Sequence, residues 1–87
     1  MFVSVFNEDG FSLPGVRVSV KRKGKRKPKW KGVTDRRGES AVRLPAEPGT
    51  YEVTTHSKEF VNETKTVEVR DRGRVDLFFR LSRATKK

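Results

Sequence analysis

Apolar and polar side chains alternate along short segments of this chain, a pattern typical of strands with one buried face. In "GVRVSVKR", Val16, Val18 and Val20 fall on one side, and polar residues fall on the other. In "RVDLFFRL", every second residue from 75 to 81 is apolar. No segment has the longer periodicity of an amphipathic helix, so the pattern predicts strands throughout.

Turn-forming residues separate these apolar runs roughly every ten residues. Clusters of Gly, Pro and Asp in "EDGFSLPG", "DRRGE", "PAEPGT" and "DRGR" supply the reversals between strands. We expect strands near residues 2–7, 16–22, 29–34, 39–44, 50–57, 64–70 and 74–81. Seven strands with one apolar face each bury those faces by packing as two sheets. The prediction is an all-β fold, a seven-stranded antiparallel Greek-key β-sandwich.

The length of 87 residues fits a single domain with a small core. The chain has no cysteine, which excludes disulfides, thiolate metal sites and cysteine nucleophiles. It contains no long apolar run, so we expect a soluble chain without a transmembrane segment. The expected domain covers residues 1–82 with a basic loop at 21–31, and residues 83–87 are expected to form a frayed basic tail.

Several turn motifs occur together in an order that points to a known family. They are Asp9-Gly10 followed by Leu13-Pro14-Gly15-Val16, Thr34-Asp35 with Gly38, and Pro48-Gly49-Thr50-Tyr51. With these motifs the chain, from Val3 to Leu81, resembles the carboxypeptidase regulatory-like domains of the transthyretin-like, or prealbumin-like, superfamily.

The resemblance implies a transthyretin-like sandwich that accompanies a peptidase domain, a surface adhesin or an outer-membrane receptor. Its implied role is structural or binding, it offers no catalytic residues to transfer, and it favours a periplasmic or cell-surface location. The loop after the second strand departs from the family pattern because it is long and basic. That loop is where we expect a function particular to this chain.

The formal net charge of +10 is concentrated in this loop, "KRKGKRKPKWK". Outside it, the basic and acidic residues almost balance. Such a local field attracts anionic partners, so the loop is a candidate polyanion-binding site. Its candidate residues are Lys21, Arg22, Lys23, Lys25, Arg26, Lys27, Lys29, Trp30 and Lys31.

Two alternatives accompany this hypothesis. A lysine-rich loop also keeps a sheet edge soluble and unpaired without binding anything. Trp30 is either a platform on which a base stacks or an anchor that packs at the start of the third strand. It shares the core with Val33 only if Gly32 forms a bulge.

Phenylalanines near both ends of the chain form a second candidate site. If Val3 and Val5 point inward, then Phe2 and Phe6 point outward and join an outward Phe78 in an apolar docking surface. The alternative register places Phe2 and Phe6 in the core and turns the valines outward.

Candidate chemistry is sparse. The one histidine, His56, falls on an outward face by alternation, and one histidine without cysteine does not make a zinc site. No calcium-binding loop motif is present. In "DRRGE", Asp35 is expected to accept backbone N–H groups in a turn that Gly38 completes with a positive φ. We therefore expect no enzyme activity, metal or cofactor.

The sequence supports two functions. The first is a non-enzymatic accessory domain that mediates protein–protein interaction or assembly in a larger protein or complex, with a protein partner or adjacent domain bound by the phenylalanines. The alternative is a polyanion-binding module for nucleic acid, an anionic glycan or a membrane surface. Neither function uses a small-molecule substrate. Salt separates the two, because it weakens ionic binding far more than apolar docking.

Overall fold

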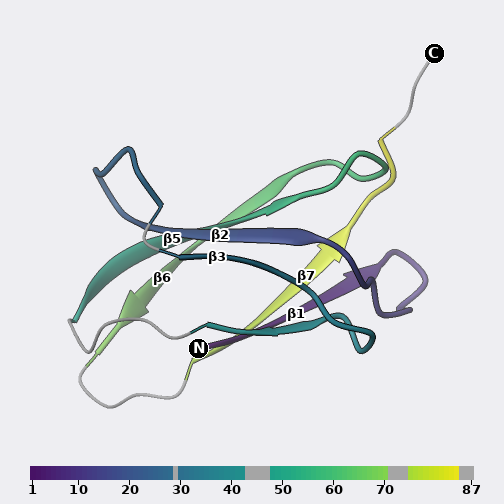
Figure 1. The fold of residues 1–87 in the computed structure, drawn as a ribbon, viewed down its shortest axis with the longest axis horizontal. Helices are drawn as coiled ribbons and strands as arrows, with labels where there is room; N and C mark the ends of the chain where they lie inside the picture. Colours follow the sequence, from purple (N-terminus) through teal and green to yellow (C-terminus); the bar gives the residue numbers. More distant parts are fainter. Residues whose placement is uncertain (29, 43–47, 71–74, 85–87) are drawn as a thin grey trace.

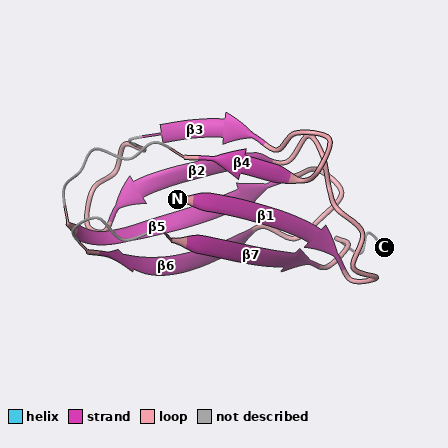
Figure 2. Cartoon of the chain, turned by 90° about the horizontal axis from the view of Figure 1, so that it is seen from below, coloured by secondary structure: helices cyan, strands magenta, loops and turns pink. Residues whose placement is uncertain are grey.

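The computed structural model describes residues 1–28, 30–42, 48–70 and 75–84, which form seven strands in two packed sheets (Figure 1). One sheet has the order β4-β1-β7 and contains β1 (Phe2–Asn7), β4 (Glu39–Ala41) and β7 (Asp76–Leu81). The other has the order β3-β2-β5-β6 and contains β2 (Arg17–Arg22), β3 (Trp30–Val33), β5 (Gly49–His56) and β6 (Glu63–Val69). Figure 2 shows the first sheet crossing in front of the second.

The predicted all-β sandwich of seven strands is confirmed. The strand bounds lie within one or two residues of the expected ones, except that β4 ends at Ala41, before the described residue Val42. The expected strand ends at Lys29, Leu44 and Arg74 lie outside the described residues.

One pairing differs from the purely antiparallel arrangement that we expected. The first strand, β1, runs parallel to the last strand, β7, while the other four pairings are antiparallel. Val3 pairs with Leu77 and Val5 pairs with Phe79 in this parallel register. Alternation along a strand is the same in both directions, which is why it did not reveal the orientation.

The core forms where the inward faces of the two sheets meet. Val3 and Val5 are fully buried, so the register that turns Phe2 and Phe6 outward is the correct one. The predicted inward faces of β2 and β7 are also confirmed by burial. The buried apolar residues are Val3, Val5, Val16, Val18, Val20, Val42, Tyr51, Val53, Phe60, Phe79 and Leu81.

A buried threonine ties the loop that precedes β2 to the end of β3. The hydroxyl of Thr34 donates to the carbonyl of Leu13 at 2.7 Å and accepts the N–H of Val16 at 2.9 Å. Two backbone bonds, from Gly15 N to Thr34 O and from Thr34 N to Val16 O, close the same junction. Two of the turn motifs that suggested the family therefore meet in space, and each satisfies the other's buried polar groups.

The turn between β3 and β4 has the predicted form. One carboxylate oxygen of Asp35 accepts the N–H groups of Arg37 and Glu39, at 2.8 Å and 3.1 Å. Gly38 has a φ of 71° and donates its N–H to the Asp35 carbonyl. Its own carbonyl accepts the N–H of Val5, so this turn also fixes β1.

A lysine crosses the open side of the sandwich between the edge strands β6 and β7. Lys65 lies opposite Val53 in β5 and therefore shares the inward phase of that residue. Its ammonium group donates to the carbonyl of Phe78 and lies 5.3 Å from the centre of the Phe79 ring. An inward-pointing charge at a sheet edge discourages pairing with another chain, and its contact with the ring adds a cation–π attraction.

The domain extends past the boundary expected at residue 82. Arg83 forms a β-bridge with Phe60 and donates its N–H to the Glu8 carboxylate at 3.2 Å. Ala84 donates its N–H to the carbonyl of Glu59 at 2.9 Å. The first two residues of the expected tail therefore belong to the folded domain, and residues 85–87 lie outside the described part of the chain.

Two glycines with positive φ provide a matched test of the β3–β4 turn. A Cβ at Gly38 would lie 2.7 Å from the carbonyl oxygen of Val5 and 2.9 Å from the nitrogen of Leu13, whereas Gly24 has no atom within 4 Å of that position. We expect Gly24→Ala to lower the free energy of unfolding by about 1–2 kcal/mol, the cost of the left-handed conformation. Gly38→Ala should lower it by roughly 1–3 kcal/mol more through overpacking. Urea denaturation of both variants measures this, and equal losses would contradict it.

Candidate functional site

The outer face of sheet β4-β1-β7 carries the three phenylalanines predicted to lie together. Phe2 is 43% exposed and Phe78 is 59% exposed, while Phe6 is half-buried. The rings of Phe6 and Phe78 stack with centroids 6.5 Å apart and an angle of 19° between their planes. We call Phe2, Phe6 and Phe78 the phenylalanine face. Its members come from the two ends of the chain because β1 pairs with β7.

Small and charged residues surround this apolar centre. Ala41 and Asp76 lie on either side of Phe2, and Arg80 lies beside Phe6 in the strand register. Glu39 lies beside Ser4, between the two phenylalanines of β1. An aromatic centre with a rim of mixed charge is the usual composition of a protein–protein interface.

The basic loop forms a hairpin end that projects beyond the strands β2 and β3 (Figure 1). Its turn is closed by a bond from Lys25 N to Arg22 O and by Gly24, whose φ is 87°. The exposed cations of this hairpin are Lys23, Lys25, Arg26 and Lys27. Lys29, another candidate, lies outside the described residues.

The remaining candidate cations belong to the strands rather than to the projecting loop. Lys21 lies 3.8 Å from the carboxylate of Glu52, and Arg22 donates to the carbonyl of Pro48 at 3.5 Å. Lys31 is exposed on β3, opposite Ser19 of β2. The predicted site is thus divided into an exposed hairpin end and a strand region with contacts of its own.

Trp30 occupies the position expected of an anchor. It is half-buried, packs against the core, and pairs with Val20 of β2. Its ring covers Gly32 so closely that a Cβ there would lie 2.0 Å from a ring carbon. Val33 is 57% exposed and takes the opposite phase, so no bulge brings it into the core. The indole is therefore engaged in packing, which favours the anchor over a stacking platform.

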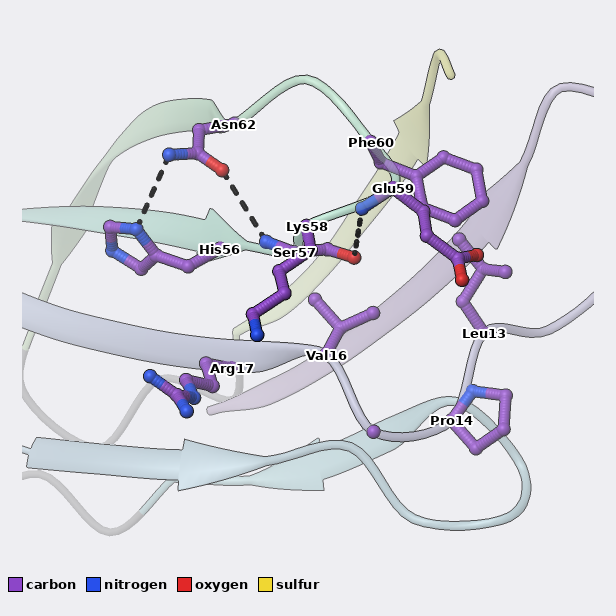
Figure 3. Close-up of a pocket in the computed structure, with 11 residues that line it drawn as sticks. Leu13, Pro14, Val16, Arg17, His56, Ser57, Lys58, Glu59, Phe60 and Asn62 are labelled. Carbon is purple, nitrogen blue, oxygen red and sulfur yellow. Dashed lines mark hydrogen bonds between the residues drawn. The ribbon is translucent and has the colours of Figure 1, made fainter. Parts of the chain in front are cut away.

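The exposed position predicted for His56 is confirmed, and the structure adds two neighbours to it. The Nε2 atom lies 3.4 Å from the hydroxyl of Ser19, and Nδ1 lies 3.4 Å from the amide nitrogen of Asn62 (Figure 3). Ser, His and Asn side chains therefore meet on one surface. The sequence pattern placed Ser19 on the outward face of its strand, but only the strand register brings it to His56.

The contacts of Asn62 favour one tautomer of this histidine when its ring is neutral. The side-chain oxygen of Asn62 accepts the N–H of Ser57, so its amide nitrogen faces His56 and donates to Nδ1. The neutral ring then carries its proton on Nε2 and donates it to Ser19. A general base would instead accept the serine proton at Nε2. In this tautomer His56 does not act as a general base for Ser19.

His56 and Arg17 lie between two adjoining clefts. One cleft, of about 640 Å³, extends over the start of the β5–β6 connection and is also lined by Lys58, Glu59 and Asn62 (Figure 3). The other, of about 550 Å³, lies on the outer face of β2 and β3. The sequence reasoning did not select Arg17, although alternation had already placed it outward on its strand.

Neither a metal-ligand cluster nor a membrane-spanning helix is found among the described residues. No group of three or more His, Asp or Glu side chains there is arranged to hold a metal ion. Nor does the described part of the chain contain a helix of the length and apolarity needed to cross a bilayer.

Comparison with known proteins shows a similarity of structure. No family model and no curated protein matches the sequence. The 5-hydroxyisourate hydrolase of Klebsiella pneumoniae superposes with a TM-score of 0.69 at 20% sequence identity, over 97% of this chain and 90% of that one. Transthyretin from Sparus aurata superposes with a TM-score of 0.69 at 19% identity, over 93% of this chain and 84% of that one.

A third similar structure is a much longer protein. The Bacillus anthracis TIE protein superposes with a TM-score of 0.74 at 22% identity, over 94% of this chain but only 16% of that one. Together these neighbours show that the chain has a transthyretin-like, or prealbumin-like, fold. At such low identity the likeness extends to the fold alone.

The contact between Trp30 and Gly32 can be tested by fluorescence because the chain has one tryptophan. Gly32→Ala would place a methyl group where the indole ring of Trp30 now lies, so we expect the ring to be displaced into water. The emission maximum should shift to the red, and the free energy of unfolding should fall by about 1–3 kcal/mol, as in overpacked cores. Lys31→Ala, on the other face of the same strand, is the control and should leave the emission unchanged. Unaltered emission in Gly32→Ala would show that the ring does not pack there.

Proposed function

We propose that this chain is a non-enzymatic accessory β-sandwich domain that mediates protein–protein interaction or assembly within a larger protein or complex. The partner docks on the phenylalanine face. The observation that carries this proposal is the stacked pair Phe6 and Phe78 on an outward sheet face, on which Phe2 and Phe78 are both exposed. The partner we expect is a neighbouring protein domain or subunit that presents an apolar surface.

The energetics of the phenylalanine face support docking. Exposed aromatic rings on a rigid sheet contribute large apolar area at little cost in conformational entropy, because their strand positions are already ordered. The rings of Phe6 and Phe78 already contact each other in the isolated domain. A partner therefore meets a preformed surface, the arrangement in which buried area is converted most efficiently into affinity.

Two further observations support an accessory role. This chain superposes on 16% of the Bacillus anthracis TIE protein, so a unit of this fold occurs as one part of a longer protein. The junction that Thr34 makes with Leu13 and Val16 gives a structural purpose to the motifs of the carboxypeptidase regulatory-like resemblance. We include that subtype in the proposal.

The histidine geometry supports the non-enzymatic part of the proposal. A hydrolase is among the structural neighbours, and Ser19, His56 and Asn62 do converge. However, Asn62 donates to Nδ1, so the ring donates to Ser19 and does not withdraw its proton. Ser19 also lies in a strand that is paired on both sides, so the backbone N–H groups of that strand are used in the sheet and do not offer an oxyanion hole.

Site-specific photo-crosslinking tests the docking surface in the cell that makes the protein. Ser4 lies between Phe2 and Phe6, so a photoreactive amino acid at position 4 should crosslink to the docked partner. The additional substitution Phe78→Ser should reduce this crosslinking at least tenfold, the effect of losing an aromatic hot spot. Because Phe78 is 59% exposed, the free energy of unfolding should change by less than about 1 kcal/mol.

Two controls make this test specific. The same photoreactive group at Thr66, on the outward side of β6, should give no crosslinked partner. Phe11→Ser removes a phenylalanine that is 70% exposed in the β1–β2 turn and should leave crosslinking at position 4 intact. Crosslinking that persists in Phe78→Ser, or that is equal at positions 4 and 66, would reject the phenylalanine face.

A second function, polyanion binding, is favoured by the exposed hairpin. Lys23, Lys25, Arg26 and Lys27 are all exposed, and the hairpin end that contains them extends beyond the strands (Figure 1). Trp30 packs against the core, so we expect ionic binding without base stacking. Such binding tolerates many anionic polymers and depends steeply on salt.

Salt titration against a short single-stranded DNA tests this second function. If four cations meet phosphates, the slope of log K against log salt should be roughly −3, from about −0.7 per contact. Lys25→Ser with Arg26→Ser should reduce the slope by about half, since two of the four contacts are lost. Arg36→Ser with Arg37→Ser removes the same charge from another turn and should leave the slope unchanged. Equal slopes in both double variants would show that the hairpin does not bind the DNA and serves only to keep the domain soluble.

A further inference from the structure

The outer face of the four-stranded sheet contains a pocket that neither proposed function uses. The strand register places Val33, Arg17 and His56 side by side across β3, β2 and β5. The next outward row contains Lys31 beside Ser19. We call the cleft of about 550 Å³ over these two rows the donor pocket, and its lining residues are Arg17, Val18, Ser19, Pro28, Lys31, Gly32, Val33 and His56.

The polar side chains of the donor pocket all present hydrogen-bond donors. Arg17 and Lys31 are cations that approach from adjacent strands, and neither can accept a hydrogen bond. The described residues that line this pocket include no carboxylate. Of the carboxylates around this face, Glu52 pairs with Lys21, and Glu59 lines the other cleft. An anion in the donor pocket would therefore meet no like charge on its walls.

The serine hydroxyl adds one more donor to the pocket. Asn62 donates to Nδ1 of His56, so Nε2–H donates to the oxygen of Ser19. The hydroxyl oxygen then accepts from His56 with one lone pair, and its hydrogen is available to donate toward the pocket. The same geometry that withholds a general base from Ser19 thus suits it to bind an oxyanion.

The walls and size of the pocket indicate an ester rather than a bare ion. A volume of about 550 Å³ is far larger than a tetrahedral oxyanion needs, and it lies within the range of small-molecule sites. Pro28 and Val33 supply an apolar side to it, and Val33 is one of the large apolar residues exposed on this protein. A ligand with an anionic group and an apolar or ring-shaped substituent matches both the cationic side and the apolar side of the pocket.

We propose that the donor pocket binds a phosphate or sulfate monoester. The oxyanion lies between the guanidinium of Arg17 and the ammonium of Lys31, accepts from Ser19, and extends its ester group along Pro28 and Val33. Arg17 is the central residue, because a guanidinium offers paired donors that match two oxyanion oxygens. This site is separate from the phenylalanine face and from the hairpin end, so it stands if either of those functions fails.

Nuclear magnetic resonance titration of the complete 87-residue chain tests the proposal at constant ionic strength. The probes are phenyl phosphate and phenyl sulfate. Inorganic phosphate and sulfate, which lack the phenyl ester group, are the comparison ligands. We expect saturable amide shifts at Arg17, Ser19, Lys31 and Val33, and tighter binding of a phenyl ester than of its inorganic ion. The ester that binds more tightly identifies the head group.

Matched variants decide whether the pocket is responsible. Arg17→Gln should weaken binding of the phenyl ester at least tenfold, whereas Arg36→Gln, which removes the same charge from an exposed turn, should leave it unchanged. The double variant Lys25→Ser with Arg26→Ser should also leave the affinity for the phenyl ester unchanged. This result would separate the pocket from polyanion binding at the hairpin. Shifts confined to the hairpin, equal effects of Arg17→Gln and Arg36→Gln, or the absence of saturable shifts at the pocket amides would each overturn the proposal.

Discussion

The parallel pairing between the first and last strands is the constraint on which the rest of this structure depends. The sheet β4-β1-β7 exists only because β1 lies between two strands that are remote from it in sequence. The register of β1 with β7 aligns Val3 with Leu77 and Val5 with Phe79, and so defines the inward face. A shift of one residue would exchange that face with the outward phenylalanines.

This arrangement is held without covalent cross-links. The chain has no disulfide, and its core consists mainly of valines on alternate strand positions. The loops therefore contribute fixed contacts of their own: Thr34 joins two connections, and Asp35 with Gly38 holds the turn against β1. The Thr34 contacts satisfy backbone groups that burial would otherwise leave unpaired, and the Asp35 contacts hold an exposed turn. The turn motifs noted in the sequence thus stabilise the connections between strands.

Much of the fold was predictable from residue patterns, whereas the candidate sites depend on which strands pair and in which register. Alternation identified the inward valines of β2, but "FVSVFN" is apolar in both phases, so burial of Val3 and Val5 was decided by partners at the other end of the chain. The role of Trp30 depends on Gly32, whose missing side chain makes room for the ring. The contact of His56 with Ser19 arises from the β2–β5 register, which no local pattern contains.

The two outward faces of the sandwich are electrostatically distinct, and the thickness of the core keeps them so. Packed sheets lie about 10 Å apart, so outward side chains on the two faces are separated by more than that distance. Exposed charges that interact through the surrounding solvent are largely screened beyond about 8 Å at physiological salt. The cations around Arg17 and Lys31 therefore act on ligands at their own face and contribute little to docking at Phe78. Outward residues on both faces also carry little of the core's stability, since the buried side chains point the other way. A domain of this construction can vary its binding surfaces separately while keeping one fold.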